Sequence, residues 1–365
     1  EADELVRCTA YLALALRRAR SWFLTNQKDV YGHYKLLWHH HLGMPVPQPS
    51  ESDLSAIYEI MGKAAWTISL SDDGLSDEFI VSTLQEIMST PAGEMASTPD
   101  EMEEFAVLPE VIAEVIGYAN SDFRSDGLHL MIDVGAGTLD VCGFILFEHR
   151  EHDRYSLLTS KVEPLGVSIL DRSRRQSIID AVSRWLTSDQ KSLDPAAPIP
   201  SDFEQYLPDA QNMREAAFHV DENFQQQSLR AAISIAHTIR SKRDPNSAVW
   251  QQELPVFLCG GGSALELYKD IVDHLSDWLK SQIEGSLGAR RVPLQKPGNL
   301  VGDIEDESFH RLAVAWGLRQ PSMDLGDYLH PEEIHDISPF RPGGRDGAEA
   351  PWWKRGDPFI GPEQM

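Results

Sequence analysis

The sequence predicts an α/β protein of two lobes. A chain of 365 residues is long enough to bury a large core in more than one compact unit. Residues 128–165 have the pattern of three consecutive strands, which predicts an antiparallel meander. Segments with apolar residues at helical spacing stand before and after this meander, and an apolar run at 254–258 predicts a further buried strand.

Helices and strands alternate in the first 125 residues. Apolar residues recur at helical spacing in 4–22, and a serine at position 50 or 52 can cap a helix that runs to about residue 68. The remaining elements expected here are a strand at 34–46, a helix at 77–89, a short buried strand at 105–108 and, after Pro109, a helix at 110–119.

Helical patterns surround the strands of the second part. We expect a helix at about 168–187, loops at 188–212, a long helix at about 213–243, a helix from 264 to about 282 and another at about 305–319. The predicted organisation is a first lobe in 1–125 and a second lobe in 126–319, with 188–253 as a peripheral helical subdomain. The region 320–365 is rich in Pro, Gly and Asp, and we expect it to be an extended or disordered tail.

A turn between two apolar strands contains the most informative motif. Asp133, Gly135, Gly137, Thr138 and Asp140 stand around it. The two glycines let the backbone take a positive φ and come close to a ligand, and successive amides in such a turn can cradle phosphate oxygens. The two acids can hold a hydrated divalent cation or orient water. We therefore expect a nucleotide phosphate site; an ordinary glycine-rich hairpin is the alternative.

Charge and composition exclude several classes of function. A formal net charge of −25 repels nucleic acids and anionic membranes, so neither is expected as a partner. A phosphate site in this chain must be built locally, from backbone amides and a metal ion. The sequence contains no membrane-length apolar run and no signal peptide, and Cys8, Cys142 and Cys259 are widely separated. These features predict buried free thiols in a cytoplasmic protein.

Other motifs give weaker or negative signals. His39 and His41 would share one face of a strand, but no acid or cysteine stands at ligand spacing, so a metal site there is the weaker interpretation. The sequence contains no G-x-x-x-x-G-K-[ST] P-loop, no G-x-S-x-G elbow and no H-E-x-x-H motif.

Four motifs occur in a meaningful order: Pro109–Tyr118, Asp133–Asp140, Val256–Ala264 and Arg311–Leu318. In this order they resemble the actin, hexokinase and heat-shock ATPase superfamily, and within it most closely the nucleotide-binding domain of DnaK-type chaperones. The resemblance covers about residues 1–319. It implies a two-lobed actin-like, ribonuclease-H-like fold that binds ATP and Mg²⁺.

The resemblance also implies roles for individual residues. Glu110 matches an acid near the attacking water and the metal, Asp133 an acid that positions water and the hydrated Mg²⁺, and Thr138 a hydroxyl near the γ-phosphate. Asp140 matches a second acid that faces the cation through water. The residues implied to bind nucleotide are Gly135, Ala136 and Gly137 around the phosphates, and Gly261, Gly262 and Ser263 at the adenosine.

The chain departs from the family pattern in three places. Val111 replaces a proline, and Leu265 replaces an arginine, which leaves the identity of the base open. The family's first phosphate hairpin and its lysine have no match before residue 110. We therefore expect a first lobe that is incomplete at its N-terminus, with residues missing before Glu1; a degenerate relative is the alternative.

The resulting hypothesis is a DnaK-like ATP-binding protein that hydrolyses ATP slowly and uses lobe closure as a switch acting with a partner protein. A complete chaperone is not expected, because no strand alternation follows residue 319. The alternatives are an actin-like filament or scaffold protein and a degenerate nucleotide-binding pseudo-ATPase. A sugar or acetate kinase is less favoured, because no substrate-binding acid is identifiable.

Overall fold

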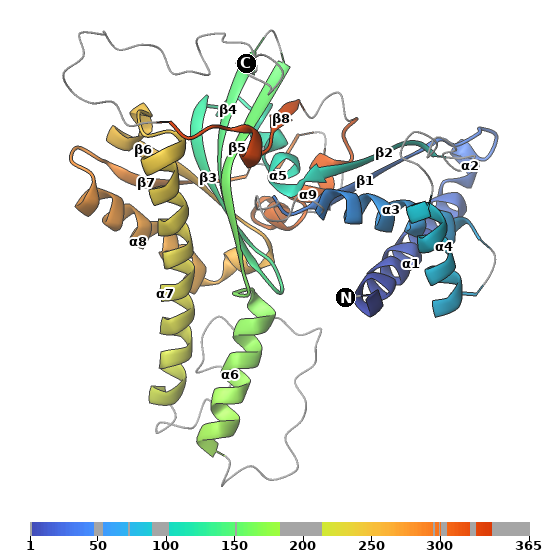
Figure 1. Cartoon of the computed structure of the whole chain (residues 1–365), viewed down its shortest axis with the longest axis horizontal. Helices are drawn as coiled ribbons and strands as arrows, with labels where there is room; N and C mark the ends of the chain where they lie inside the picture. The colour runs from blue at the N-terminus through green and yellow to red at the C-terminus, as the bar shows by residue number, and fades with distance from the viewer. Residues whose placement is uncertain are drawn as a thin grey trace. The chain divides into compact units, whose positions relative to one another are not determined.

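A computed structural model describes residues 2–46, 54–71, 74–89, 102–149, 152–182, 214–294, 296–298, 300, 305–321 and 326–337. The chain divides into two compact units (Figure 1), and each is described by itself. Unit 1 comprises Glu1–Ala113 and Leu318–Asp324, and unit 2 comprises Glu114–Gly317 and Leu325–Met365. The division falls inside helix α5 (Glu110–Ala119), whereas the sequence predicts a lobe limit at residue 125.

Unit 1 combines helices with a small parallel sheet. Its helices are α1 (Ala2–Asn26), α2 (Lys28–Tyr31), α3 (Leu54–Leu70) and α4 (Asp77–Ser89). The strands β1 (Trp38–Met44) and β2 (Met102–Pro109) pair in parallel. The predicted helices at 4–22, 77–89 and 110–119 and both predicted strands are confirmed, with ends that differ by a few residues.

Helix α1 packs on α3 through small side chains and a half-buried arginine. Ala13, Ala64 and Ala65 are fully buried in the core of this unit. The Arg17 guanidinium donates to the carbonyl oxygens of Ile68 and Ser71 at 3.0 and 2.9 Å. Carbonyl groups at the end of a helix have no partner within the helix, so Arg17 stabilises the end of α3 and joins it to α1.

Six strands of unit 2 form one mixed sheet in the order β7-β6-β3-β4-β5-β8. The predicted meander is confirmed as β3 (Gly127–Val134), β4 (Leu139–His149) and β5 (His152–Glu163), and β6 (Glu253–Cys259) runs parallel to β3. The fifth strand, β7 (Gly288–Val292), runs parallel to β6. A meander whose first strand is extended by two parallel strands is the ribonuclease-H-like arrangement of actin-like proteins, so the predicted α/β fold class is confirmed.

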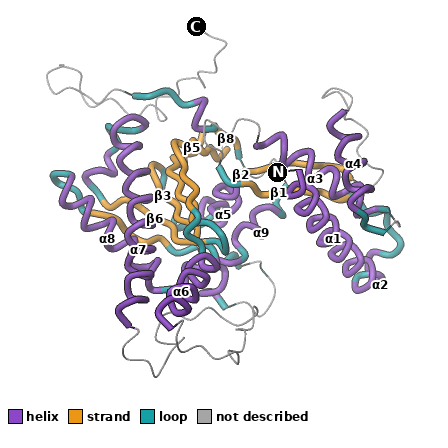
Figure 2. Tube along the Cα trace, turned by 60° about the horizontal axis from the view of Figure 1, so that its bottom comes forward, coloured by secondary structure: helices purple, strands orange, loops and turns teal. Residues whose placement is uncertain are grey.

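Helices α7 (Arg214–Thr238) and α8 (Glu266–Gln282) pack against this sheet (Figures 1 and 2), and α7 also packs against α6 (Val167–Val182). Helix α9 (Ala313–Leu318) follows later in the chain. The predicted long helix at 213–243 ends as α7 at Thr238 and continues as a π-helical turn, Ile239–Arg243. The last predicted helix is divided into a 3-10 turn, Asp306–Arg311, and α9. The loops predicted at 188–212 lie outside the described residues.

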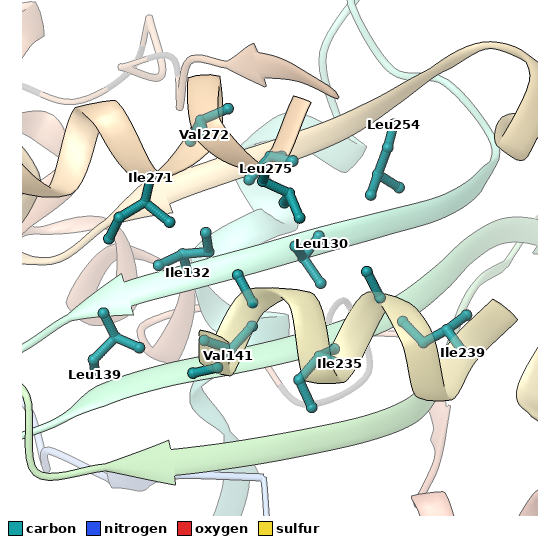
Figure 3. Packing of buried hydrophobic residues seen from close by; sticks show 14 of the residues in the cluster. Leu130, Ile132, Leu139, Val141, Ile235, Ile239, Leu254, Ile271, Val272 and Leu275 are labelled. Carbon is teal, nitrogen blue, oxygen red and sulfur yellow. The ribbon is translucent and has the colours of Figure 1, made fainter. Parts of the chain in front are cut away.

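The core of unit 2 lies between the sheet and helices α7 and α8 (Figure 3). Leu130 and Ile132 on β3 face Ile235 on α7 and Ile271 on α8, and all four are buried. Because successive strand residues point to opposite faces, His129, Met131 and Asp133 belong to the other face of β3. Two of the three thiols, Cys142 and Cys259, are buried as predicted, whereas Cys8 on α1 is exposed.

The C-terminal region contributes to the sheet, which the sequence does not predict. The prediction of an extended or disordered tail over 320–365 is wrong for strand β8 (Asp327–Leu329), which pairs in parallel with β5, and for the 3-10 turn Pro331–Glu333. The following residues contact the π-helical turn: the Ile337 amide donates to the Lys242 carbonyl at 2.6 Å, and Arg243 donates to the Ile334 carbonyl. A strand of three residues is too short to show alternation in the sequence.

The second face of the sheet contains a buried aromatic cluster around His129. Its ring stacks on Phe144 and Phe257 at centroid distances of 5.3 and 5.7 Å, and its Nδ1 lies 2.8 Å from the Gly127 carbonyl oxygen. Burial lowers the pKa of His129 to about 4. The imidazole is therefore neutral in the folded protein near neutral pH.

We predict that His129 lowers stability in acid. Between pH 6.5 and 4 the unfolded imidazole binds a proton and the folded one does not, so this residue's contribution to stability is full above pH 6.5 and falls as the pH decreases. The free energy of unfolding of wild type should fall by up to about 3 kcal/mol relative to His129→Phe across this range. Denaturant titrations at several pH values measure it, with exposed His219→Phe as control; equal pH profiles for wild type and His129→Phe would contradict the prediction.

Candidate functional site

The start of helix α6 holds the loop of the β3–β4 hairpin. The amides of Gly166, Val167 and Ser168 donate to the carbonyl oxygens of Gly137, Gly135 and Ala136 at 3.2, 3.1 and 2.8 Å. Amides at the start of a helix have no partner within the helix, and carbonyl groups of a tight loop have none within the strands. These three contacts therefore satisfy both sets and fix the planes of the loop peptides.

The same contacts determine where the loop amides point. In a trans peptide the N–H group points opposite to the carbonyl group, and the described backbone contains no cis peptide. Each carbonyl group that accepts a hydrogen bond from α6 shares its peptide with the amide of the next residue. The amides of Ala136, Gly137 and Thr138 therefore point away from α6. None of these amides donates a hydrogen bond within the described part of the chain. Three adjacent unpaired amides suit the oxygens of a phosphate.

The glycines of the loop are not explained by backbone strain. Gly135 and Gly137 are free to take a positive φ, but neither is among the glycines that do so. A Cβ atom added at Gly137 would meet no heavy atom within 4 Å, and one at Gly135 would come no closer than 3.5 Å, to the Thr138 carbonyl oxygen. The fold has room for side chains at both positions. Glycine at these two positions leaves the loop backbone uncovered by side chains.

Two carboxylates face each other beside this loop. Asp133 on β3 is the direct cross-strand neighbour of Asp140 on β4. Burial, and secondly the charge of Asp140, raise the pKa of Asp133 to about 6; burial also raises the pKa of Asp140, which accepts a 3.1 Å hydrogen bond from the Thr138 hydroxyl. One oxygen of each carboxylate is buried and has no hydrogen-bond partner among the described residues. Like charges at such a position repel, so a cation or ordered water would stabilise the pair.

This donor set fits Mg²⁺ held through water. Magnesium keeps several of its waters and is usually bound by one or two carboxylates together with phosphates. Within the described ranges, no group of three or more His, Cys, Asp and Glu side chains is placed to hold a metal ion directly. Asp133 and Asp140 would therefore contact the ion through its waters, and the loop amides would bind the phosphates that complete its shell.

A second glycine turn packs against the hairpin. Strand β6 ends at Cys259, the neighbour of Asp133 in register, and Gly260 follows with a φ of +76°. A Cβ atom at Gly260 would lie 2.1 Å from Asp133 Oδ1, and one at Gly262 would lie 2.4 Å from Val134 Cγ1. Only glycine lets this turn come so close to the acid.

The predicted adenosine residues lie in this turn. Gly261, Gly262 and Ser263 belong to the 3-10 turn Gly261–Ala264, which leads into α8. The Ser263 hydroxyl donates to the Gly260 carbonyl oxygen at 2.8 Å, so its hydrogen is used within the turn. The structure therefore brings Gly261, Gly262 and Ser263 into the same unit as the hairpin, with Gly260 in contact with Asp133.

Two residues of this region are missing from the sequence-based site. A Cβ atom at Gly166 would lie 2.5 Å from the Gly137 carbonyl carbon, so glycine is needed for α6 to approach the loop. Arg311 is exposed, its side chain forms no hydrogen bond or ion pair with the described residues, and its Nε would lie 3.9 Å from a Cβ at Gly261. In the sequence, Gly166 is marked only by its place between a strand and a helix. Arg311 is marked only as the first residue of the fourth motif.

Glu110 and the histidines of β1 belong to unit 1. Glu110 is half-buried at the start of α5, where a Cβ at Gly43 would lie 3.2 Å from its Oε1. The rings of His39 and His41 are 6.2 Å apart, and His41 Nδ1 lies 2.7 Å from the Leu318 carbonyl oxygen. The action of Glu110 together with Asp133 stays a prediction.

Comparison with known proteins gives structural matches only. No family model matches the chain, and no curated protein matches it. Among the solved structures that align with it is the PilM–PilN type IV pilus biogenesis complex, with 16% sequence identity and a TM-score of 0.34 over 67% of this chain and 57% of that one. MreB 5 of Spiroplasma citri bound to AMPPNP aligns with 13% identity and a TM-score of 0.35 over 84% of this chain and 73% of that one. An archaeal actin homolog aligns with 13% identity and a TM-score of 0.34 over 66% of this chain and 65% of that one. The chain thus spans little more than half the length of the pilus protein. Among the described helices, none is long and apolar enough to cross a membrane.

We predict that Gly260→Ala disrupts the contact between the two turns. The new methyl group would overlap Asp133 and the backbone of Val134 at a positive φ, so the variant should lose about 2–4 kcal/mol of unfolding free energy. Gly261→Ala is the matched control, because its Cβ would meet only Arg311 at 3.9 Å and its φ is not positive. Urea unfolding of both variants measures the effect; equal losses would contradict this account of Gly260.

We also predict that Asp133→Asn stabilises the free protein. Its carboxyl group has a pKa of about 6 in the folded chain and an ordinary one in the unfolded chain, so its ionisation lowers stability as the pH rises from about 4 to 6. The neutral amide removes this penalty and the repulsion from Asp140, which should add roughly 1–3 kcal/mol at pH 7. Denaturant unfolding without nucleotide measures the gain, and the gain should disappear near pH 4. A loss of stability at pH 7 would contradict the burial of an uncompensated charge.

Proposed function

We propose that this chain is an actin-like nucleotide-binding protein that serves as a scaffold for a partner protein. The nucleotide would be ATP or a related molecule with Mg²⁺. The observation that carries the proposal is the hairpin loop of unit 2, in which three amides point away from the α6 contact and have no partner among the described residues.

The surrounding groups support the same assignment. The cradle would hold the phosphates through Ala136, Gly137 and Thr138, and Asp133 and Asp140 would bind the hydrated Mg²⁺. Because the chain carries a net charge of −25, local amides and a cation are the means of attracting a polyphosphate. The adjoining turn, Gly261–Ser263, would take the nucleoside, with Arg311 as a cation beside it.

Slow ATP hydrolysis, with the DnaK-like switch that the resemblance implies, is the second candidate. A buried carboxylate with a raised pKa favours it, because Asp133 would be placed to hold the hydrated Mg²⁺ and to accept a proton from water, while the ion would supply charge neutralisation of the phosphates. Thr138, hydrogen-bonded to Asp140, would then lie near the reacting phosphate. Phosphoryl transfer needs mainly such positioning and charge neutralisation.

We predict that Gly137→Ala removes nucleotide binding while keeping the fold. The methyl group would have space inside the protein but would occupy the surface that the phosphate approaches, so affinity for Mg-ATP should fall at least about tenfold, a change of 1.4 kcal/mol in binding free energy. Gly74→Ala is the matched control, because a Cβ at that glycine also meets nothing within 4 Å. Calorimetry with Mg-ATP, Mg-ADP and EDTA measures binding, and thermal unfolding verifies stability.

Distinct outcomes separate the candidates. Wild type that gives no heat and no thermal shift at millimolar Mg-ATP would contradict the nucleotide site itself. Binding with no phosphate release over hours supports the scaffold, whereas release that Asp133→Asn abolishes supports the hydrolase. Binding that Gly137→Ala leaves intact would place the nucleotide elsewhere.

A further inference from the structure

Exposed apolar side chains of this protein are concentrated near its N-terminus. Among the described residues, eight of the fifteen large apolar side chains with high exposure lie between Tyr11 and Leu37. Scattered exposed apolar groups are ordinary, but a concentration of them marks an interaction surface. The strongest part of this concentration is on α1, the long first helix.

One face of α1 has an ordered pattern of cations and apolar groups. At 100° per residue, Arg7, Tyr11, Leu14, Arg18 and Trp22 fall within an arc of about 80°, and we call this set the α1 stripe. Its apolar members are exposed by 72%, 51% and 56% for Tyr11, Leu14 and Trp22. The stripe therefore runs along the helix for four turns on the side that faces solvent.

The opposite face of α1 already has its partner inside unit 1. Thr9 and Ala13 are completely buried on that side, and the helix packs there on α3 and α4. The α1 stripe is thus not the core-facing side of an amphipathic helix. A solvent-facing stripe of this kind usually carries charged and polar residues only, so its apolar members need another explanation.

The two arginines of the α1 stripe are available for contact. Both are exposed, and neither side chain forms an ion pair or hydrogen bond within the described part of the chain. Arg17 and Arg20, by contrast, are used inside unit 1, where the Arg20 guanidinium lies 5.3 Å from the Trp66 ring centre. A guanidinium packed on an aromatic ring is therefore an interaction that this unit already contains.

We propose that the α1 stripe binds a second copy of this chain, with the two α1 helices antiparallel. If the twofold axis passes between Leu14 and Ala15, Arg7 lies opposite Trp22 of the other copy, and Tyr11 lies opposite Arg18. Each arginine then meets an aromatic ring, and the leucines meet at the centre. A twofold interface must be self-complementary, and cation–π pairs satisfy that condition for the five residues of the α1 stripe, none of which is an acid. The exposed Glu4 lies on the same face about one turn before Arg7, and in this register Thr25 of the other copy lies opposite it.

The order of residues favours a second copy over other occupants. An acidic segment would pair with the arginines but leave Tyr11 and Trp22 without specific partners. An anionic membrane would meet a chain of net charge −25. The reversed α1 helix offers an aromatic ring at the height of each arginine and an arginine at the height of each ring.

Sedimentation equilibrium of the whole chain without nucleotide tests the proposal, and wild type should dimerise. Leu14→Glu should raise the dimer dissociation constant at least about tenfold, since two buried carboxylates would meet at the axis. Leu24→Glu is the matched control: Leu24 is a leucine of the same helix with 48% exposure, but it lies about 120° around the helix from the α1 stripe.

A swap of two residues tests the register. Tyr11→Arg alone places two arginines opposite each other and should weaken the dimer, whereas Tyr11→Arg combined with Arg18→Tyr restores each cation–ring pair and should recover it. In a Cys8→Ser background, Leu14→Cys should form a disulfide between copies under oxidation, and Leu24→Cys should not. Circular dichroism verifies that every variant is folded.

Several results would overturn the proposal. They are a chain that stays monomeric at all concentrations, a dimer that Leu14→Glu and Leu24→Glu weaken equally, and a swap that fails to recover association. A monomer that binds anionic vesicles through Tyr11 and Trp22 would assign the α1 stripe to a membrane instead. Because no nucleotide is present, these outcomes are independent of the phosphate site.

Discussion

The contact between the start of α6 and the hairpin loop is the interaction on which the candidate site depends. Three amides of α6 fix three carbonyl groups, and peptide geometry then turns the next three amides outward. Gly166 permits the approach, because any side chain there would overlap the loop backbone. The outward orientation of the three loop amides is thus a product of packing between a helix and a turn, and no charged side chain is needed to produce it.

Two carboxylates lie beside this loop in an arrangement that is unfavourable without a ligand. Asp133 and Asp140 are opposed on neighbouring strands, each with a buried oxygen that lacks a partner among the described residues. Such an arrangement lowers stability in the absence of a ligand, because two desolvated carboxylates repel. A cation bound between phosphates and acids would relieve the repulsion. Binding of such a ligand would therefore recover the free energy of folding that is lost here.

Sequence periodicity predicted most of the fold, because long amphipathic helices and the meander have strong patterns. It missed β7 and β8, whose five and three residues are too few to alternate, and it extended the helix of 213–243 through a π-helical turn. For the site, the motif identified the hairpin and the second turn, but the freedom of Gly135 and Gly137 to take a positive φ is not used in the fold. Gly166 and Arg311 were not assigned to the site from the sequence, because the approach of α6 to the loop and the nearness of Arg311 to Gly261 are visible only in the fold.

The π-helical turn after α7 has a consequence for how unit 2 loses its order. Its carbonyl and arginine bonds go to Ile334, Asp336 and Ile337, and the same segment continues from β8 at the edge of the sheet. Helix end, edge strand and C-terminal segment therefore open together or not at all, as one cooperative element of local unfolding. Cleavage of the C-terminal segment, or force applied to it, would therefore destabilise the end of α7 and, through that helix, the core of unit 2.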